Sequence, residues 1–282
     1  ALMTSGTLYR LSAFTTEPDG GNPAGVWIGE QLPTPAEMQR IATDVGFSET
    51  AFVVPCVGLH RTVRYYSPAA EVAFCGHATI AAGVLLGELN GEADYQFDTV
   101  PGTVPVSVIS ENGIPSAALT SVDPKQEPIE AERLRAYLLA LDWDASELDP
   151  VVPPAKAFAG AWHLILAARS VERLDRLAYD FDPLKALMLE DGLTTVQLIW
   201  RDSPGVIHAR NPFPVGNVVE DPATGAAAAA LGGYLRAAGL VDPPARILLR
   251  QGEAMGRPSR LIVDIPERGG IRVSGHAVRL PD

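Results

Sequence analysis

The sequence contains only two cysteines, Cys56 and Cys75, among 282 residues. So few cysteines exclude a disulfide framework, and neither of them stands in the spacing of a zinc site. No Gly-x-Gly-x-x-Gly or Walker-type loop occurs either, so we expect neither a metal nor another cofactor. A reducing, cytoplasmic compartment is the natural expectation.

Long apolar runs and clusters of positive charge are also missing. No segment reaches the roughly 18 uncharged residues of a membrane span, and the N-terminus lacks the basic and apolar regions of a signal peptide. Lys and Arg number 22 against 34 Asp and Glu, a formal net charge of −12. Because a phosphate-binding surface needs clustered Lys and Arg, nucleic acid is excluded as a partner, and a membrane is not expected.

The composition that remains, 47% apolar and 20% charged residues, is that of an ordinary globular protein with a sizeable core. Short alternating or β-branched runs bounded by Gly and Pro predict strands, and helical patterns are fewer, so an α+β class is indicated. The predicted strands are 9–14, 24–28, 50–54, 62–66, 104–109, 194–200, 206–210, 261–265 and 271–278. The predicted helices are 35–45, 79–88, 130–139, 170–174, 183–189 and 225–238.

One spacing occurs twice and indicates an internal duplication. The two copies are Arg64-x3-Pro68-x6-Cys75 and Arg210-x3-Pro214-x6-Asp221, so that 210−64, 214−68 and 221−75 all equal 146. Each copy leads into a helix that is apolar or small on every face, which is typical of a buried helix. We expect an N-terminal lobe over residues 1–118 and a C-terminal lobe over 119–270. The last strand, within 271–282, is a candidate addition to the N-terminal lobe.

The turn from Cys75 through Gly76 to His77 combines a thiol, an imidazole and the free N–H groups of a helix start, which favour an anion. The alternative is a small buried Cys75 with a capping His77. In the second copy, Asp221 precedes Thr224, Gly225 and another helix, and ordinary capping is again the alternative.

Glu49 lies in Ser48-Glu49-Thr50, between an amphipathic helix and an apolar strand. A carboxylate at the mouth of a buried strand is suited to general acid or base work near neutral pH, whereas a solvated loop glutamate is the alternative. Other glycine-containing turns, such as the one that holds Asn22, offer backbone donors but are common in proteins.

Together these blocks resemble the phenazine biosynthesis PhzF-like family of the diaminopimelate epimerase-like fold. The resemblance runs over nearly the whole chain. Its carriers are Phe14-Thr15, Gly21-Asn22-Pro23-Ala24, Met38-Gln39, Ile41-Ala42, Ser48-Glu49-Thr50-Ala51-Phe52-Val53, Arg64-Tyr65-Tyr66-Ser67-Pro68-x2-Glu71, Cys75-Gly76-His77-Ala78-Thr79, Glu220-Asp221-Pro222-Ala223-Thr224-Gly225 and Gln251-Gly252-x2-Met255-Gly256-Arg257-Pro258-Ser259.

The resemblance implies two pseudo-symmetric lobes, each a β-barrel-like roll around a central buried helix, with the active site between them. It implies a cofactor-independent isomerase, acting on a small anionic metabolite, and a homodimer. Glu49, His77 and Asp221 are then the catalytic positions. The substrate-binding positions are Asn22, Cys75, Gly76, Thr224, Gly225 and Ala226.

Two departures bear on the substrate and the mechanism. Phenazine-pathway members typically have Ser after Thr-Gly, whereas Ala226 stands here, so the substrate is in doubt. Epimerase relatives of this fold use one cysteine on each helix-start loop, whereas the second copy has Asp221 and no thiol. A proton transfer centred on Glu49 is therefore the leading hypothesis.

Two other hypotheses remain. Cys75 and His77 could form a nucleophilic thiol pair, although neighbours two apart at a helix start do not generally face each other. Alternatively, the chain could be a small-molecule binding protein without catalysis.

Overall fold

The computed structural model of the chain describes residues 5–282, so residues 1–4 of the expected N-terminal lobe lie outside the described residues. The chain divides into two compact units. Unit 1 runs to Thr120 and also contains Ser274–Asp282, whereas unit 2 is Ser121–Val273. Within residues 5–282, no helix combines the length and the apolar character needed to cross a bilayer.

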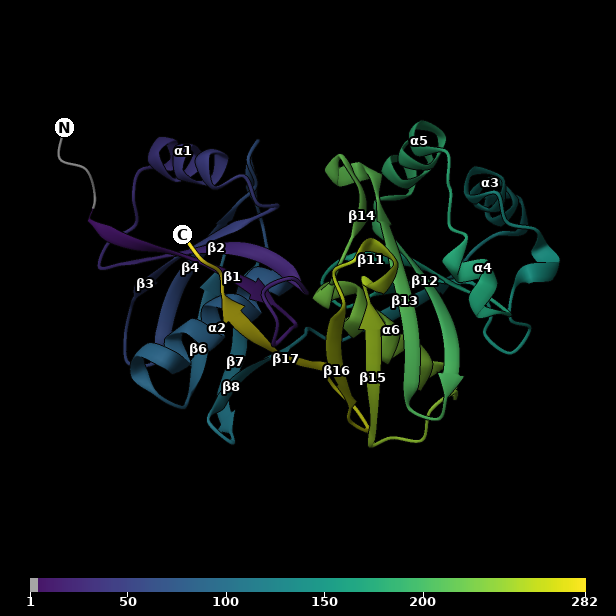
Figure 1. Cartoon of the computed structure of the whole chain (residues 1–282). Helices are drawn as coiled ribbons and strands as arrows, with labels where there is room; N and C mark the ends of the chain where they lie inside the picture. Colours follow the sequence, from purple (N-terminus) through teal and green to yellow (C-terminus); the bar gives the residue numbers. More distant parts are fainter. Residues whose placement is uncertain (1–4) are drawn as a thin grey trace. The chain divides into compact units, whose positions relative to one another are not determined.

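Unit 1 is a closed barrel around one helix (Figure 1). Its elements are β1 (Gly6–Ala13), β2 (Asn22–Gly29), α1 (Pro35–Val45), β3 (Thr50–Pro55), β4 (His60–Tyr66), β5 (Glu71–Val72), α2 (Gly76–Asn90), β6 (Ala93–Thr99), β7 (Gly102–Glu111), β8 (Ile114–Thr120) and most of β17 (Arg272–Arg279). The ring runs β1-β2-β3-β4-β6-β7-β8-β17 and closes where β17 pairs with β1. Helix α2 contacts five of these strands and is buried from its first residue to Leu86.

Unit 2 repeats the plan around α6 and adds helices on its outside. Its elements are β9 (Lys125–Pro128), α3 (Ala131–Leu141), η1 (Ala145–Glu147), β10 (Ala155–Phe158), β11 (Trp162–Ala167), α4 (Val171–Asp175), α5 (Phe181–Asp191), β12 (Leu193–Ser203), β13 (Val206–Phe213), η2 (Pro214–Gly216), β14 (Val218–Asp221), α6 (Gly225–Ala237), β15 (Ala245–Gln251), η3 (Glu253–Met255) and β16 (Ser259–Ile265). The expected fold class, α+β with two rolls around buried helices, is confirmed.

The pairings of the two units match strand by strand. β2 runs parallel to β3 as β11 does to β12, and β4 runs parallel to β6 as β13 does to β15. The hairpins β3–β4 and β12–β13 are antiparallel in both. The duplication seen in the repeated spacing is therefore a repeated supersecondary unit.

The buried helices have glycine where neighbouring segments approach them closely. A Cβ on Gly83 would lie 2.8 Å from Cβ of Ala117, and one on Gly233 would lie 2.3 Å from Cβ of Pro124. Glycine normally costs a helix about 1 kcal/mol relative to alanine, and here that cost is offset by close packing. Glycine at these positions therefore lets neighbouring segments pack directly against the helix backbone.

The constant offset of 146 predicts that Asp221 is the counterpart of Cys75, and this prediction is wrong. Arg64 bonds Glu71 and Arg210 bonds Glu220, so the spacing between the ion-pair partners grows from seven residues to ten. The three extra residues lie in the loop that contains η2. Beyond that loop the offset is 149, and the counterpart of Cys75 is Thr224, since each caps its helix.

A buried polar network crosses the strands of unit 2. His163 Nδ1 lies 2.8 Å from Thr195 Oγ1, and the Thr195 hydroxyl donates to Asn211 Oδ1 at 2.7 Å. Because that hydroxyl already donates, it accepts from an Nδ1–H of His163. Burial lowers the pKa of His163 to about 3 and keeps the ring neutral.

This burial predicts a loss of stability in acid. The unfolded chain takes up a proton at His163 near the ordinary pKa of about 6.5, whereas the folded chain does so only near 3. Stability is therefore complete above the higher value and falls by up to about 1.4 kcal/mol per pH unit between the two. Urea unfolding at several pH values should show this extra slope in the wild type and not in His163→Asn. Parallel stability curves for the two proteins would contradict the assignment.

Candidate functional site

Glu49 lies directly before β3, and its backbone is hydrogen-bonded to β2. Helix α1 ends at Gly46, and the N–H of Gly25 on β2 donates to the carbonyl of Glu49 at 3.2 Å. A Cβ on Gly25 would lie 2.7 Å from Thr50 Oγ1, so glycine lets β2 lie this close. The carboxylate of Glu49 is thus carried on a fixed segment.

Cys75 is the N-cap of α2 and has an extended backbone, with φ −145° and ψ 117°. The Thr79 hydroxyl donates to the carbonyl of Cys75 at 2.8 Å, and Tyr65 donates to that hydroxyl at 2.6 Å. Burial raises the pKa of Tyr65, which keeps it protonated as a donor. The Thr79 N–H bonds the same carbonyl at 3.1 Å, so the N–H groups before it lie outside the helical ladder and suit an anion.

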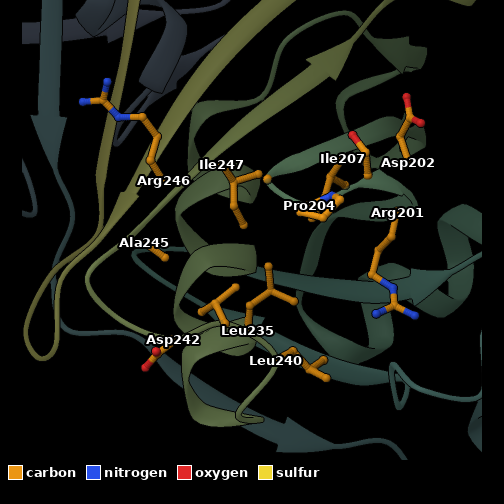
Figure 2. A pocket seen from close by; sticks show the side chains of 13 residues that line it. Arg201, Asp202, Pro204, Ile207, Leu235, Leu240, Asp242, Ala245, Arg246 and Ile247 are labelled. Carbon is orange, nitrogen blue, oxygen red and sulfur yellow. The ribbon is translucent and has the colours of Figure 1, made fainter.

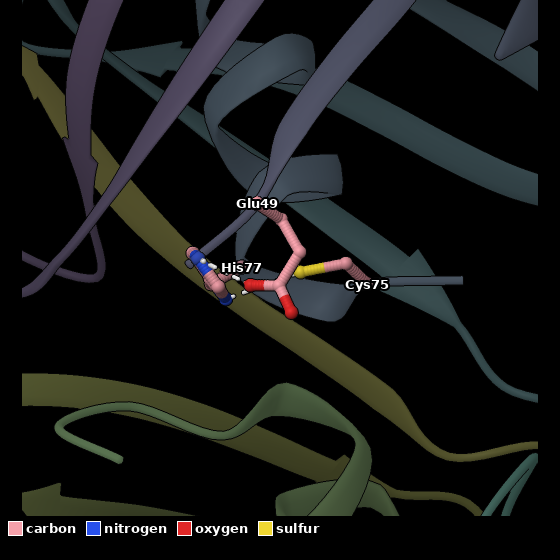
Figure 3. A group of neighbouring side chains, drawn as sticks. All are labelled: Glu49, Cys75 and His77. Carbon is pink, nitrogen blue, oxygen red and sulfur yellow. Dashed lines mark hydrogen bonds and ion pairs between the residues drawn. The ribbon is translucent and has the colours of Figure 1, made fainter. Parts of the chain in front are cut away.

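His77 contacts both Glu49 and Cys75 (Figure 3). Its Nδ1 lies 3.2 Å from Sγ of Cys75, and its Nε2 lies 3.6 Å from Oε2 of Glu49. The Ser48 hydroxyl also contacts Nε2, at 3.3 Å. The side chains of His77 and Glu49 are only 6% and 14% exposed, so these contacts are poorly screened by water.

The expectation that Cys75 and His77 do not face each other is wrong. That expectation holds for two residues inside a helix, where positions i and i+2 point in different directions. Cys75, however, is the cap, and its extended backbone turns the thiol toward the imidazole in the first turn.

Thiolate, imidazole and carboxylate are also donors for a metal ion, and one donor atom from each residue lies within 4.8 Å of the others. A single ion binds one nitrogen of an imidazole. His77 turns Nδ1 to Cys75 and Nε2 to Glu49, so the ring connects the two groups rather than converging with them on one point. The imidazole therefore lies between the thiol and the carboxylate and contacts each with a different nitrogen.

In unit 2, the equivalent helix start is organised around a carboxylate. Asp221 Oδ2 accepts from the Thr224 hydroxyl at 2.7 Å. Gln251, 1% exposed, donates to the carbonyl of Asp221 at 2.8 Å and to Thr224 Oγ1 at 3.0 Å. It also accepts from the N–H of Thr224 at 3.2 Å, so three hydrogen bonds join Gln251 to this loop.

The other predicted positions lie as follows. Asn22 begins β2 opposite Ala13 and is buried, and Gly76 is the first residue of α2. Gly225 and Ala226 open α6, whose first intrahelical bond runs from Ala228 N to the carbonyl of Thr224. Glu49, Cys75 and His77 form one cluster in unit 1, and Asp221 and Thr224 form another in unit 2.

Sequence reasoning assigned no role to Ser48 or Gln251. Ser48 stands beside Glu49, and a hydroxyl next to a candidate base is a usable signal. Gln251 could be found only as a polar residue at the end of an apolar strand, since its partners lie about 30 residues away.

A pocket of about 430 Å3 lies elsewhere in unit 2, between the β12–β13 turn and the end of α6 (Figure 2). Its rim includes Arg201 and Asp202, which are paired with Asp149 and His208. None of the predicted site residues lines it, so we do not assign the chemistry to this pocket.

The comparisons with known proteins agree with this architecture. The family model described as phenazine biosynthesis-like protein (PhzC-PhzF) matches residues 11–282. An uncharacterized isomerase of Deinococcus radiodurans is 33% identical over 92% of this chain and 87% of its own. The trans-2,3-dihydro-3-hydroxyanthranilate isomerase of Pseudomonas fluorescens is 27% identical over 95% of both chains. The crystal structure of a PhzF-family phenazine biosynthesis protein of Bacillus anthracis matches with a TM-score of 0.84 and 25% identity, over 97% of this chain and 96% of that one.

The role of Gln251 in shaping the second loop predicts a cost in stability. Gln251→Leu keeps the volume but leaves the buried Thr224 N–H and the Asp221 carbonyl without this partner. We expect urea denaturation to show about 1–3 kcal/mol less stability. The neighbouring Arg250→Gln removes only a surface ion pair with Glu253, worth less than about 1 kcal/mol. Equal effects of the two substitutions would show that Gln251 does not hold the loop.

Proposed function

The chain belongs to the phenazine biosynthesis-like family and is an isomerase, and we propose that it moves a proton on a small carboxylate-bearing metabolite with Glu49 as general acid and base. No cofactor is needed for this chemistry, because a positioned carboxylate and its neighbours suffice for proton transfer.

The observation that carries the proposal is the contact between Glu49 and His77, with the carboxylate at 14% exposure on a fixed segment. An imidazole beside a carboxylate stabilises whichever protonation state the reaction leaves, because it can donate or accept at Nε2. Ser48 contacts the same nitrogen and helps to orient the ring.

The start of α2 supports an anionic substrate. The N–H groups of Gly76 and His77 precede the first intrahelical bond and stand beside the Glu49 cluster. A carboxylate bound there gains the N-terminal partial charge of the helix as well as hydrogen bonds. In unit 2, Gly225 and Ala226 give α6 a comparable start, where the Thr224 hydroxyl donates to Asp221.

The relative in Pseudomonas fluorescens acts on a dihydroanthranilate by name. That compound is a suitable first probe. Because Ala226 follows Gly225 where phenazine-pathway members typically have Ser, we propose a different substrate for this chain, of the same carboxylate class.

Glu49→Gln should abolish base-catalysed exchange while keeping the shape of the side chain. The wild type is offered trans-2,3-dihydro-3-hydroxyanthranilate and other small carboxylic acids in D2O. For each acid that it labels, we expect deuterium uptake, followed by mass spectrometry, to slow by about 10²- to 10⁴-fold in the variant. Glu30→Gln, an exposed glutamate directly after β2, is the matched control and should exchange at the wild-type rate. Exchange by the Glu49 variant at the wild-type rate would rule out this residue as the base.

A further inference from the structure

Four buried polar side chains of unit 2 form one chain of hydrogen bonds. His163 on β11 donates from Nδ1 to Thr195 Oγ1 at 2.8 Å, and the Thr195 hydroxyl donates to Asn211 Oδ1 at 2.7 Å. The side-chain amide of Asn211 then donates to Oε1 of Gln197. Each of these residues is at most 1% exposed, so any polar atom among them that lacks a partner destabilises the folded state.

The chain of hydrogen bonds ends at two nitrogen atoms. Among residues 5–282, Nε2 of His163 and Nε2 of Gln197 have no hydrogen-bond partner. The first is an acceptor, because the proton of the neutral ring is on Nδ1, and the second is a donor. Reversing every hydrogen bond, with both amide groups turned over, exchanges these roles and still leaves one donor and one acceptor.

The strand pairing places the two ends close to each other. His163 lies opposite Thr195 across the parallel pair of β11 and β12, and Gln197 lies two residues further along β12, on the same face. His163 and Gln197 are therefore diagonal neighbours, with Cα atoms roughly 7–8 Å apart, a separation that long side chains and one small molecule can bridge.

We propose that unit 2 contains an internal binding site for one water molecule, which donates to Nε2 of His163, accepts from the amide of Gln197 and closes the chain of hydrogen bonds into a ring. A water molecule offers both a donor and an acceptor, so it removes the cost of both unpaired atoms at once.

The charges of the four side chains exclude an ion as the occupant. All four are neutral, because burial lowers the pKa of His163 to about 3 and the other three do not ionise. An anion would face the lone pair of His163 Nε2, and a cation would face the N–H groups of Gln197. Neither ion would gain a counter-charge from this chain of hydrogen bonds, whereas a neutral molecule fits both ends.

Unit 1 satisfies its equivalent polar group without such a molecule. The offset of 146 between the hairpins β3–β4 and β12–β13 makes Asn211 the counterpart of Tyr65. Tyr65 bonds the Thr79 hydroxyl of α2 at 2.6 Å. At the offset of 149, the counterpart of Thr79 in α6 is Ala228, which has no hydroxyl. Asn211 instead bonds side chains of β12, and two ends remain unpaired.

The water site also borders Asp221. In the antiparallel pair of β13 and β14, Asn211 lies opposite Asp221, and residues directly opposite each other share a face of the sheet. A closed ring therefore helps to hold the strand beside Asp221. This consequence matters for catalysis only under the proposed function, whereas the water site itself does not depend on that function.

A crystal structure of the wild-type chain, at a resolution that shows ordered water, tests the site directly. We expect one density peak within about 2.7–3.2 Å of Nε2 of both His163 and Gln197. In solution, the ring of His163 and the side-chain amide of Gln197 should both show nuclear Overhauser effects to a long-lived water molecule. No peak, an ion, separate waters on the two atoms, or a direct contact between the two side chains would overturn the proposal.

Gln197→Met tests whether one molecule joins the two ends. Methionine keeps the length of the side chain but has no amide donor, so the water signal should disappear and the nitrogen resonance of His163 Nε2 should shift as it loses its donor. Gln126→Met changes an exposed glutamine of β9 in the same unit and should alter neither signal. A water signal and a His163 resonance that both survive Gln197→Met would contradict a shared water. If this variant does not fold, the wild-type measurements decide, and none of them uses a substrate, so their outcome is separate from the deuterium test of Glu49.

Discussion

The structure depends on one constraint: in each unit, an apolar helix is enclosed by strands, and the polar groups at its start must be satisfied where it meets the loop. Helix α2 is buried from Gly76 to Leu86, and α6 is similarly buried apart from Ala226 as far as Leu235. The first N–H groups of such a helix have no partner within the helix, and the side chains of the cap residues Cys75 and Thr224 do not accept from them. These N–H groups therefore favour an anion. The same requirement that stabilises the fold therefore creates two helix starts suited to anions.

The N-terminal ends of α2 and α6 carry different chemical groups. In unit 1 the capping residue Cys75 contacts an imidazole, and in unit 2 the capping Thr224 donates to a carboxylate. A thiol beside an imidazole can pass its proton to the ring, whereas a hydroxyl that donates to a carboxylate keeps its proton. The two starts therefore share an architecture and differ in chemistry, which agrees with a site that is not built on two equivalent cysteines.

Much of the fold could be predicted from the pattern of residues. Helix α1 and the beginnings of α3, α5 and α6 lie at or within two residues of their predicted positions, because apolar spacing and capping are local signals. The strands β6 and β15 were not predicted. The alternation of polar and apolar side chains along Ala93–Thr99 is itself a strand signal that was missed. In Ala245–Gln251 arginines flank the apolar centre, so pairing with neighbouring strands decides this element.

By itself, the sequence determined the fold class, the family, the duplication and the identity of the candidate groups, because each is encoded in residues close together or in a repeated spacing. Only the tertiary structure decided which groups meet. The three residues added around η2 shift the offset, so that Thr224 and not Asp221 is the counterpart of Cys75. The contact of Cys75 with His77, and that of His77 with Glu49, arise from the extended backbone of the helix cap and from a loop 26 residues earlier in the chain. Spacing cannot specify such contacts, because they depend on where the barrel places separate segments.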